Sequence, residues 1–335
     1  MKRLNVILIT LLIIVILISP IFSSHGQTDK MGLKTSGLSI KVSKVGNFND
    51  GGDHWGVFVE NSFAYIANGR EGLEIIDISD PSSPFETGQY NDGGYAYKVY
   101  VSGNFAYVAE GMWGLEIIDV SNKSSPSEVG QYYDGGDARA IYVSDPYAFV
   151  ADWDDGLEII DISNKSAPFE VGQYYDGGHA KDVCTNGSYA YVADSRDGLE
   201  ILDISNISSP TKIGQFYDGG EAWGLDIFAY YAYLGDWDNG LEIIDISNKS
   251  APFEVGQYYD GGYAYQVQIV DSYIYVADWS DGLEIIDNST LTEIGHFYDG
   301  GHSLDVFVLD SYIYLGDSND GLEILYIFEE EENIL

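Results

Sequence analysis

Cysteine and helical periodicity are both scarce in this chain of 335 residues. A single cysteine, Cys184, excludes a disulfide within the chain and a metal centre built from several thiolates. We expect it to be a small packed side chain, so stability has to come from hydrophobic packing. Beyond residue 26 no hydrophobic period of 3.6 residues appears, which excludes a helical domain.

Basic residues are also few. The chain has 15 Lys and Arg residues against 54 Asp and Glu, which gives a formal net charge of −39. Such a charge argues against nucleic acid and anionic membrane surfaces as partners. The negative charge favours cations, cationic partners or a salty environment. The need of an exported protein to stay soluble explains the same charge equally well.

A repeat dominates what remains. The segment Asp-Gly-Leu-Glu-Ile-Ile-Asp-Ile-Ser recurs with small changes, five successive intervals being 42 residues and the last 39. Seven copies in phase indicate one repeat architecture rather than several ordinary domains. Its glycine falls at Gly72, Gly114, Gly156, Gly198, Gly240, Gly282 and Gly321, and an Asp-Gly-Gly marker keeps step at Asp50, Asp92, Asp134, Asp176, Asp218, Asp260 and Asp299.

Each copy divides into four short runs rich in Val, Ile and Tyr. In the second copy they cover residues 97–101, 105–109, 115–119 and 128–133, bounded by Gly, Asn, Ser and Pro, which predicts four strands. The last copy has only three such runs, and residues 45–49 supply a spare one. We therefore predict an all-β, seven-bladed propeller with four-stranded blades, closed by an N-terminal strand that completes the last blade. An open solenoid is the alternative, and it would need capping repeats.

The repeat motif resembles a known family. Gly-Leu-Glu-Ile-Ile-Asp-Ile-Ser, preceded by Ala-Tyr-Val-Ala and followed by Pro and Val-Gly, is similar to the LVIVD repeat across residues 45–327. Two copies depart from it: Tyr326 replaces the motif Asp in the last, and the sixth shortens the loop after Asp287 by three residues. The resemblance implies a β-propeller, often on secreted or surface proteins, and no single activity.

The N-terminus has the order of a secretory signal. Lys2 and Arg3 precede an apolar run over residues 6–18, and small residues follow up to Gly26. We predict a signal peptide over residues 1–26 (an uncleaved anchor is the alternative), a polar tether over 27–44, the propeller over 45–328 and an acidic tail over 329–335. The protein is then extracellular, secreted or tethered at the cell surface, touches a membrane only through this segment, and is expected to be a monomer.

Carboxylates gather at one end of the predicted ring. Connections in a four-stranded blade alternate between two ends, so the Asp-Gly-Gly turns share one end, here called the top, with the loops before each Gly-Leu-Glu-Ile. Oxygen ligands of this kind suit calcium, although Asp and Gly also serve tight turns. The candidate calcium ligands in the loops are Asp152, Asp154, Asp155, Asp236, Asp238, Asp278 and Asp281.

All six tryptophans also fall at the top, where the copies disagree. Duplicated copies share scaffold residues, so variable positions around the central opening are candidates for binding. We expect a binding scaffold that recognises a carbohydrate, or a cationic peptide or protein, by aromatic stacking and carboxylate hydrogen bonds, with calcium assisting. The candidate ligand-binding residues are Trp55, Tyr95, Tyr97, Trp113, Arg139, Trp153, His179, Lys181, Glu221, Trp223, Trp237, Tyr263, Tyr265 and Trp279.

An extracellular hydrolase or lyase is a second interpretation, and a structural component of a surface layer is a third. No Ser/His/Asp motif, phosphate-binding glycine loop or metalloprotease motif appears. A zinc site is conceivable, because ring closure brings the first and last copies together. The residues for catalysis would be Asp53, His54, Asp137, His179 and His302, and those for zinc His54, Asp53, His302 and Asp305.

Glycosylation signals fall at the opposite end of the ring, here called the bottom. In an exported chain, Asn-x-Ser/Thr is a candidate glycan acceptor, although a Ser-Asn-Lys-Ser turn copied with its repeat explains most of these sites. The candidate acceptors are Asn122, Asn164, Asn186, Asn206, Asn248 and Asn288.

Overall fold

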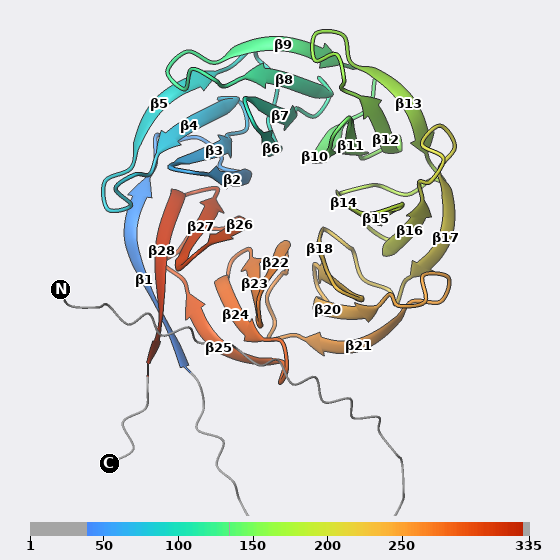
Figure 1. The fold of residues 1–335 in the computed structure, drawn as a ribbon. Coiled ribbons are helices and arrows are strands. Elements are labelled where there is room, and N and C mark those ends of the chain that lie inside the picture. The colour runs from blue at the N-terminus through green and yellow to red at the C-terminus, as the bar shows by residue number, and fades with distance from the viewer. Residues whose placement is uncertain (1–38, 134, 331–335) are drawn as a thin grey trace, which may run out of the picture. The chain divides into compact units, whose positions relative to one another are not determined.

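The computed structural model describes residues 39–133 and 135–330. The chain there forms 28 strands arranged in seven antiparallel sheets of four, and each sheet is one blade of a ring. Seven strands face the centre of the ring in Figure 1: β2, β6, β10, β14, β18, β22 and β26. The seven-bladed propeller predicted from the repeats is confirmed. No helix among the described residues is long and apolar enough to cross a membrane.

The strands follow the sequence repeats closely, from the inner strand of each blade to the outer. Blade 1 contains β2 (Gly56–Glu60), β3 (Phe63–Ala67), β4 (Leu73–Asp77) and β5 (Phe85–Tyr90); blade 2 contains β6 (Lys98–Ser102), β7 (Phe105–Ala109), β8 (Leu115–Asp119) and β9 (Ser127–Tyr132). Blade 3 contains β10 (Ala138–Ser144), β11 (Tyr147–Asp152), β12 (Gly156–Asp161) and β13 (Phe169–Tyr174); blade 4 contains β14 (Asp182–Asn186), β15 (Tyr189–Ala193), β16 (Leu199–Asp203) and β17 (Thr211–Phe216). Blade 5 contains β18 (Gly224–Phe228), β19 (Tyr231–Asp236), β20 (Gly240–Asp245) and β21 (Phe253–Tyr258); blade 6 contains β22 (Gln266–Val270), β23 (Tyr273–Asp278), β24 (Gly282–Asp287) and β25 (Thr292–Phe297). Blade 7 contains β26 (Ser303–Leu309), β27 (Tyr312–Asp317), β28 (Gly321–Glu330) and, as its outer strand, β1 (Ser39–Phe48).

The N-terminal strand closes the ring as predicted, and it is longer than expected. β1 pairs antiparallel with β28 from Ser39 opposite Glu330 to Phe48 opposite Leu322. It therefore begins six residues before Val45, inside the segment predicted to be a tether, and β28 runs into the predicted acidic tail. The apolar side chain of Ile40 is the reason, because it is buried in the core between blades 6 and 7. The predicted signal peptide lies outside the described residues.

Each blade is apolar on both faces, so each one needs a neighbour on both sides. Ile75 of β4 packs with β6 and β7 of blade 2, whereas Ile76 packs with β27 and β28 of blade 7. Consecutive residues of a strand point to opposite faces, which explains why the third strand of every repeat carries an unbroken apolar pair. The cores thus lie between blades, as seven layers around the ring.

The inner strands have no further strand to pair with, and side chains satisfy part of their backbone. Asp305 Oδ2 accepts a hydrogen bond from the Val57 amide, and Asp182 Oδ2 accepts one from the Leu225 amide of the next blade. Lys98 Nζ lies 2.8 Å from Asp305 Oδ1 and balances one of these buried charges. The centre of the ring is therefore a polar plug that also links neighbouring blades.

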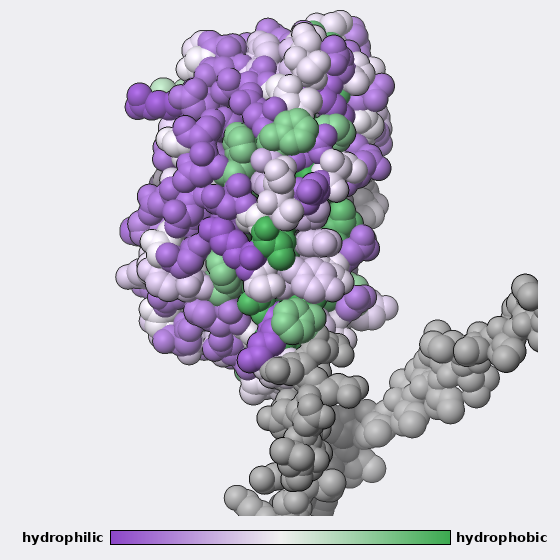
Figure 2. Space-filling model, turned by 90° about the vertical axis from the view of Figure 1, so that its left-hand side faces the viewer, coloured by the Kyte–Doolittle hydropathy of each residue, from purple (hydrophilic) through white to green (hydrophobic). Residues whose placement is uncertain are grey.

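The outer surface carries mostly hydrophilic residues. Figure 2 shows the edge of the ring near β1, where apolar residues form small groups among polar ones. A surface of this kind agrees with the large excess of acidic residues and favours solubility.

We predict that Ile40→Ala destabilises the whole ring, because Ile40 seals the core at the closure. Truncation of a buried Ile to Ala removes apolar contacts and leaves a cavity, so we expect a loss of about 2–4 kcal/mol in the free energy of unfolding. Chemical denaturation of the purified protein measures this. Ser43→Ala, an exposed change in the same strand, should shift stability by less than about 0.5 kcal/mol. Equal effects of the two changes would contradict a closing role for β1.

Candidate functional site

A short loop follows the second strand of each blade at the top, and in five blades one of its first two residues bridges to the next blade. That residue has a left-handed backbone, with φ of 45° at Gly69, 54° at Gly111, 24° at Trp237 and 28° at Trp279. Glycine adopts this region easily, whereas a bulky side chain is strained there. In blades 5 and 6 tryptophan occupies this position, although glycine would adopt the same backbone with less strain. This suggests a role beyond folding for the two tryptophans. The bridges join Gly69 to Ala96, Gly111 to Ala138, Ser195 to Ala222, Trp237 to Ala264 and Trp279 to Ser303.

These tryptophans join other aromatic residues in a continuous group, here called the aromatic belt. Trp237 is its centre, with ring centroids 5.0 Å from Trp223, 4.9 Å from Tyr263 and 4.8 Å from Trp279. Trp223 also lies 4.7 Å from Tyr265. The belt therefore has its densest part over the top of blades 5 and 6 and extends to rings of other blades, and most of its rings belong to the predicted set. Its members are Trp55, Tyr95, Tyr97, Trp153, His179, Trp223, Trp237, Tyr263, Tyr265, Trp279 and His302.

Lys181 interrupts the belt with a positive charge. Its Nζ lies 3.4 Å from the ring centroid of Trp153 and 3.5 Å from that of Trp223, so the ammonium is held between two indole faces. Burial, helped by the positive charge of Arg139, lowers the pKa of Lys181 to about 7. The two aromatic rings favour the charged form of Lys181, whereas removal from water disfavours it. The loss of hydration has the larger effect, so the pKa falls.

Arg139 is the second cation at the opening. Its guanidinium carbon lies 4.2 Å from the ring of Tyr97 and 4.9 Å from that of Trp153. One of its nitrogens lies 2.5 Å from Asp137 Oδ2. His179 stacks on Trp153 with 4.9 Å between ring centroids, on the side of blade 4. The opening thus combines stacking surfaces with two basic side chains, of which Arg139 is paired with Asp137 and Lys181 has a pKa near neutrality.

The central opening is narrow, because these side chains fill most of it. The cavity among Trp55, Arg139, Lys181, Trp223 and Tyr265 has a volume of about 50 Å³. That is room for one or two water molecules. A larger ligand would therefore lie across the top of the belt instead of entering the ring. A second cavity of about 160 Å³ lies nearer the bottom, beside Cys184 and the polar plug.

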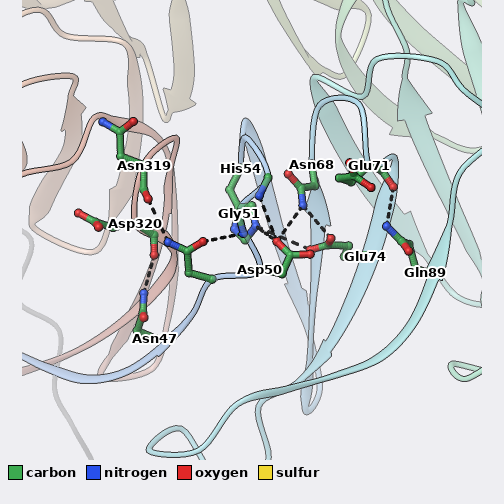
Figure 3. A network of polar contacts seen from close by, with 12 residues as sticks. Asn47, Asp50, Gly51, His54, Asn68, Glu71, Glu74, Gln89, Asn319 and Asp320 are labelled. Carbon is green, nitrogen blue, oxygen red and sulfur yellow. Dashed lines mark hydrogen bonds and ion pairs between the residues drawn. The ribbon is translucent and has the colours of Figure 1, made fainter.

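The residues proposed for catalysis are dispersed in the structure. His54 is fully buried, with Nε2 3.6 Å from Asp50 Oδ1 and 3.7 Å from Glu74 Oε2, as Figure 3 shows. Asp53 accepts a hydrogen bond from the Tyr95 hydroxyl. His302 contacts Trp279 and Asn319.

The residues proposed for zinc are not gathered either. His54 belongs to the buried cluster of blade 1, and Asp305 lies in the polar plug beside Lys98. Since His54 is one position out of phase with His302, its ring turns into the blade instead of toward the opening. The described residues thus contain no assembled pair of His54 and His302, and the geometry gives the zinc prediction no support.

Two of the predicted ligand-binding residues lie outside the belt. Trp113 is 42% exposed, and among the described residues it makes no ring contact with the belt. It stands two positions after Gly111, whereas Trp237 and Trp279 are themselves bridging residues and Trp153 occupies the equivalent position of its repeat. Glu221 forms an ion pair with Arg196, with Nε 2.8 Å from its Oε1.

The carboxylates proposed for calcium separate into two groups. Asp154 and Asp238 are exposed at loop tips, whereas Asp152, Asp236 and Asp278 are buried. The buried ones do not gather with their loop neighbours. Asp236 and Asp278 each meet a glutamate of the third strand and the aspartate of the Asp-Gly-Gly turn, in the sets Asp218, Asp236, Glu242 and Asp260, Asp278, Glu284.

The third-strand glutamate was not among the predicted ligands, and one signal could have found it. Every copy places one Glu inside the otherwise apolar Leu-Glu-Ile strand, and a polar residue retained in an apolar strand needs a partner. Burial raises the pKa of Glu242 to about 9 and that of Glu284 to about 10, and the nearby turn aspartates add to both shifts. The members of this set are Glu74, Glu116, Glu158, Glu200, Glu242, Glu284 and Glu323.

The candidate glycan acceptors are mostly accessible. Asn122, Asn164, Asn186, Asn206 and Asn248 are exposed, whereas Asn288 is half-buried and donates a hydrogen bond to the Tyr233 hydroxyl. Four of the exposed asparagines also accept a hydrogen bond from the hydroxyl of the serine two residues later. Such bonds are typical of a tight turn, the alternative explanation of these sites. Whether glycans are attached stays a prediction.

We predict that tryptophan fluorescence titrates with an apparent pKa of about 7, because Lys181 loses its proton there while it sits between two indoles. The sign follows from linkage: the unfolded chain keeps this proton up to about pH 10.5, so this group adds stability as pH rises from about 7 to 10.5. A His179→Gln background removes the other titrating group beside Trp153. Lys181→Met should abolish the transition, and Lys249→Met at the bottom should retain it. A transition that survives Lys181→Met would contradict the assignment.

Comparison with known proteins agrees with this architecture. No curated protein matches the chain. Among solved structures, a crystal structure of the computationally designed Ika8 protein matches with a TM-score of 0.63 at 8% identity, covering 87% of this chain and 100% of the designed one. At that identity the likeness concerns the fold alone. The LVIVD repeat model matches residues 51–92, 93–134, 135–176, 177–218, 219–260, 261–296 and 300–327. The matches span nearly the whole ring, and the chain belongs to the LVIVD repeat family.

Proposed function

We propose that this protein is an exported binding scaffold, and that the aromatic belt recognises a carbohydrate that carries carboxylate groups. The propeller fold of this family supports a scaffold for interactions, since the fold itself brings no chemistry. The observation that carries the proposal is the position of Lys181, whose ammonium is held between Trp153 and Trp223 at the opening.

The belt suits the flat faces of sugar rings. Indole and phenol rings offer large apolar surfaces with a polar edge, and they lose little entropy when they bind. Trp237 and Trp279 keep a strained backbone that glycine would relieve, as expected of residues retained for a surface role. The narrow opening favours a ligand that lies across the belt, where it would contact several rings at once.

The two cations at the opening favour an acidic sugar over a cationic peptide. Arg139 and Lys181 are buried or half-buried in the belt, whereas the protein as a whole is strongly acidic. A carboxylate on the ligand would gain from these charges, and a lysine-rich peptide would be repelled at the same place. The carboxylates elsewhere at the top repel anions, so an anion without rings that stack on the belt would bind poorly. This adds specificity.

The other interpretations have less support in the geometry. The candidate catalytic residues are scattered between the opening and the interior of blade 1. An outer location is part of the proposal and follows from the signal-like residues 1–26. A ligand on an extracellular polysaccharide fits such a location.

We predict that the protein binds oligogalacturonate more tightly than dextran or pentalysine, since only the first combines ring faces with carboxylates. Calorimetric titration of the purified protein with each of the three probes measures this. Trp237→Gly should weaken binding of oligogalacturonate at least about tenfold, which corresponds to about 1.4 kcal/mol. It should fold normally, because glycine tolerates the left-handed backbone.

Tyr230→Ala is the matched control, an exposed aromatic residue in a bottom loop, and should bind as the unaltered protein does. Preference for pentalysine would instead support the cationic-peptide interpretation. Shortened products in the oligogalacturonate samples, detected by mass spectrometry, would indicate a lyase or hydrolase. No binding to any of the three would refute the proposal.

A further inference from the structure

A cluster of three acidic positions recurs under the top of the blades, and it is separate from the aromatic belt. Its members are the aspartate of the Asp-Gly-Gly turn, the acid that follows or ends the second strand, and the glutamate of the third strand. We call this set the blade cluster. In blades 2, 5 and 6 one oxygen from each member lies within 4.8 Å of the other two, in the sets Asp92, Glu110, Glu116; Asp218, Asp236, Glu242; and Asp260, Asp278, Glu284.

Two of the three carboxylates of blade 5, Asp236 and Glu242, are buried, and both have oxygens that lack donors. Glu242 is 0% exposed, and neither of its carboxylate oxygens has a hydrogen-bond partner. Asp236 is 2% exposed and leaves Oδ1 without a partner as well. Buried acceptors that lack donors are costly, and two or three carboxylates this close repel each other. A positive charge at its centre would relieve this repulsion and allow the carboxylates to ionise.

Blade 6 repeats the same arrangement. Glu284 is 1% exposed with Oε1 unpartnered, and Asp278 is 3% exposed with Oδ1 unpartnered. Both sets lie against a glycine of the adjacent turn, Gly220 or Gly262, where an added Cβ would collide with the Asp236 or Asp278 carboxylate. The turn therefore closes tightly over the carboxylates, and its second glycine permits that approach.

Two other blades show what fills the centre of such a cluster. In blade 4, Lys212 Nζ lies 2.8 Å from Glu200 Oε1 and 2.5 Å from Asp176 Oδ2. In blade 7, Lys44 Nζ lies 2.6 Å from Glu323 Oε1 and 2.8 Å from Asp299 Oδ2. An ammonium from the outer strand thus bridges the turn aspartate and the third-strand glutamate in both.

The corresponding outer-strand position is acidic in the remaining blades. Lys212 pairs with Leu202 in the ladder, and Glu254 pairs with Ile244 at the same register of blade 5. Where blades 4 and 7 carry a lysine, the other blades carry an additional carboxylate. A cation from solution would therefore stabilise those other clusters more. The acidic residues at this position are Glu86, Glu128, Glu170, Glu254 and Glu293.

Blade 1 differs in a way that fits this pattern. Asn68 replaces the second-strand acid, and its Nδ2 donates a hydrogen bond to Glu74 Oε1 at 2.7 Å. His54 contacts the other Glu74 oxygen in the same cluster, as Figure 3 shows. Asn68 thus supplies a donor to one oxygen of Glu74, and the His54 imidazole lies beside the other, so this cluster has two carboxylates to balance where blades 2, 5 and 6 have three.

We infer that the blade clusters of blades 2, 5 and 6 each bind one divalent cation of the calcium class, at the point that a lysine ammonium occupies in blades 4 and 7. The ligands are all carboxylate oxygens, which suit a hard cation, and no cysteine or histidine of blades 5 and 6 takes part. The cation joins the turn that enters the blade to the second and third strands. Its role is structural and does not depend on what binds at the aromatic belt.

Calcium titration of the purified, EDTA-treated protein tests this, with calorimetry for stoichiometry and thermal unfolding for stability. We expect saturable binding, with an upward shift in Tm of about 3 °C for each site occupied at ten times its dissociation constant. Dissociation constants of about 10⁻⁴–10⁻³ M would match extracellular calcium sites.

A reciprocal exchange between blades 4 and 5 makes the test specific. Glu254→Lys should lower the calcium stoichiometry by one and raise the Tm in EDTA, since it supplies the missing ammonium. Lys212→Glu should raise the stoichiometry by one and lower the Tm in EDTA, and calcium should restore it. Glu86→Lys in blade 1 is the control and should leave the stoichiometry unchanged.

Unaltered stoichiometry in both exchange variants would overturn the inference, as would the absence of saturable calcium binding. A calcium response that is equal in all variants and disappears in high salt would also overturn it, because it would reflect screening of the net negative charge. Binding of oligogalacturonate is measured separately with and without calcium, so failure of one proposal leaves the other to be judged on its own result.

Discussion

The requirement that every blade be covered on both faces governs this structure. Because consecutive residues of each strand point to opposite faces, a pair such as Ile75 and Ile76 commits the blade to two neighbours. Only a closed ring provides two neighbours for all seven blades, and β1 closes it by pairing with β28. The inner strands then approach one another at the centre, where Asp182 and Asp305 accept amide hydrogen bonds across blades.

Buried carboxylates are the main electrostatic cost of this design. The formal charge of −39 assumes that every acid is ionised, yet burial raises the pKa of Glu110 to about 9 and that of Glu74 to about 8. Without a cation, such groups hold protons near neutral pH, and the effective charge is smaller. With a lysine or a metal ion at the centre they ionise at lower cost, so the blade clusters link the net charge of the protein to its stability.

The fold was predictable from sequence because its signals are local and repeated seven times. Strand periodicity and Asp-Gly-Gly turns placed the blades, and a missing fourth strand indicated the closure. The candidate site was less predictable. Trp113 and Trp153 look alike in sequence, but a shift of two positions in the loop keeps Trp113 out of the belt. Glu242 escaped notice because comparison of copies treats a shared residue as scaffold, and its contacts with Asp218 and Asp236 arise only in three dimensions.

Positions that all seven copies share and positions that vary between copies thus have different chemical roles at the same end of the ring. The shared acids of the turn and third strand gather under the top surface. Six blades balance this charge with a lysine (blades 4 and 7), with Asn68 in place of an acid (blade 1) or, as inferred, with a cation (blades 2, 5 and 6). The variable positions surround the opening, and their rings pack across blade boundaries. A rigid lower layer is what allows Trp237 to keep a strained backbone above it, since strain persists only where the surroundings determine the conformation.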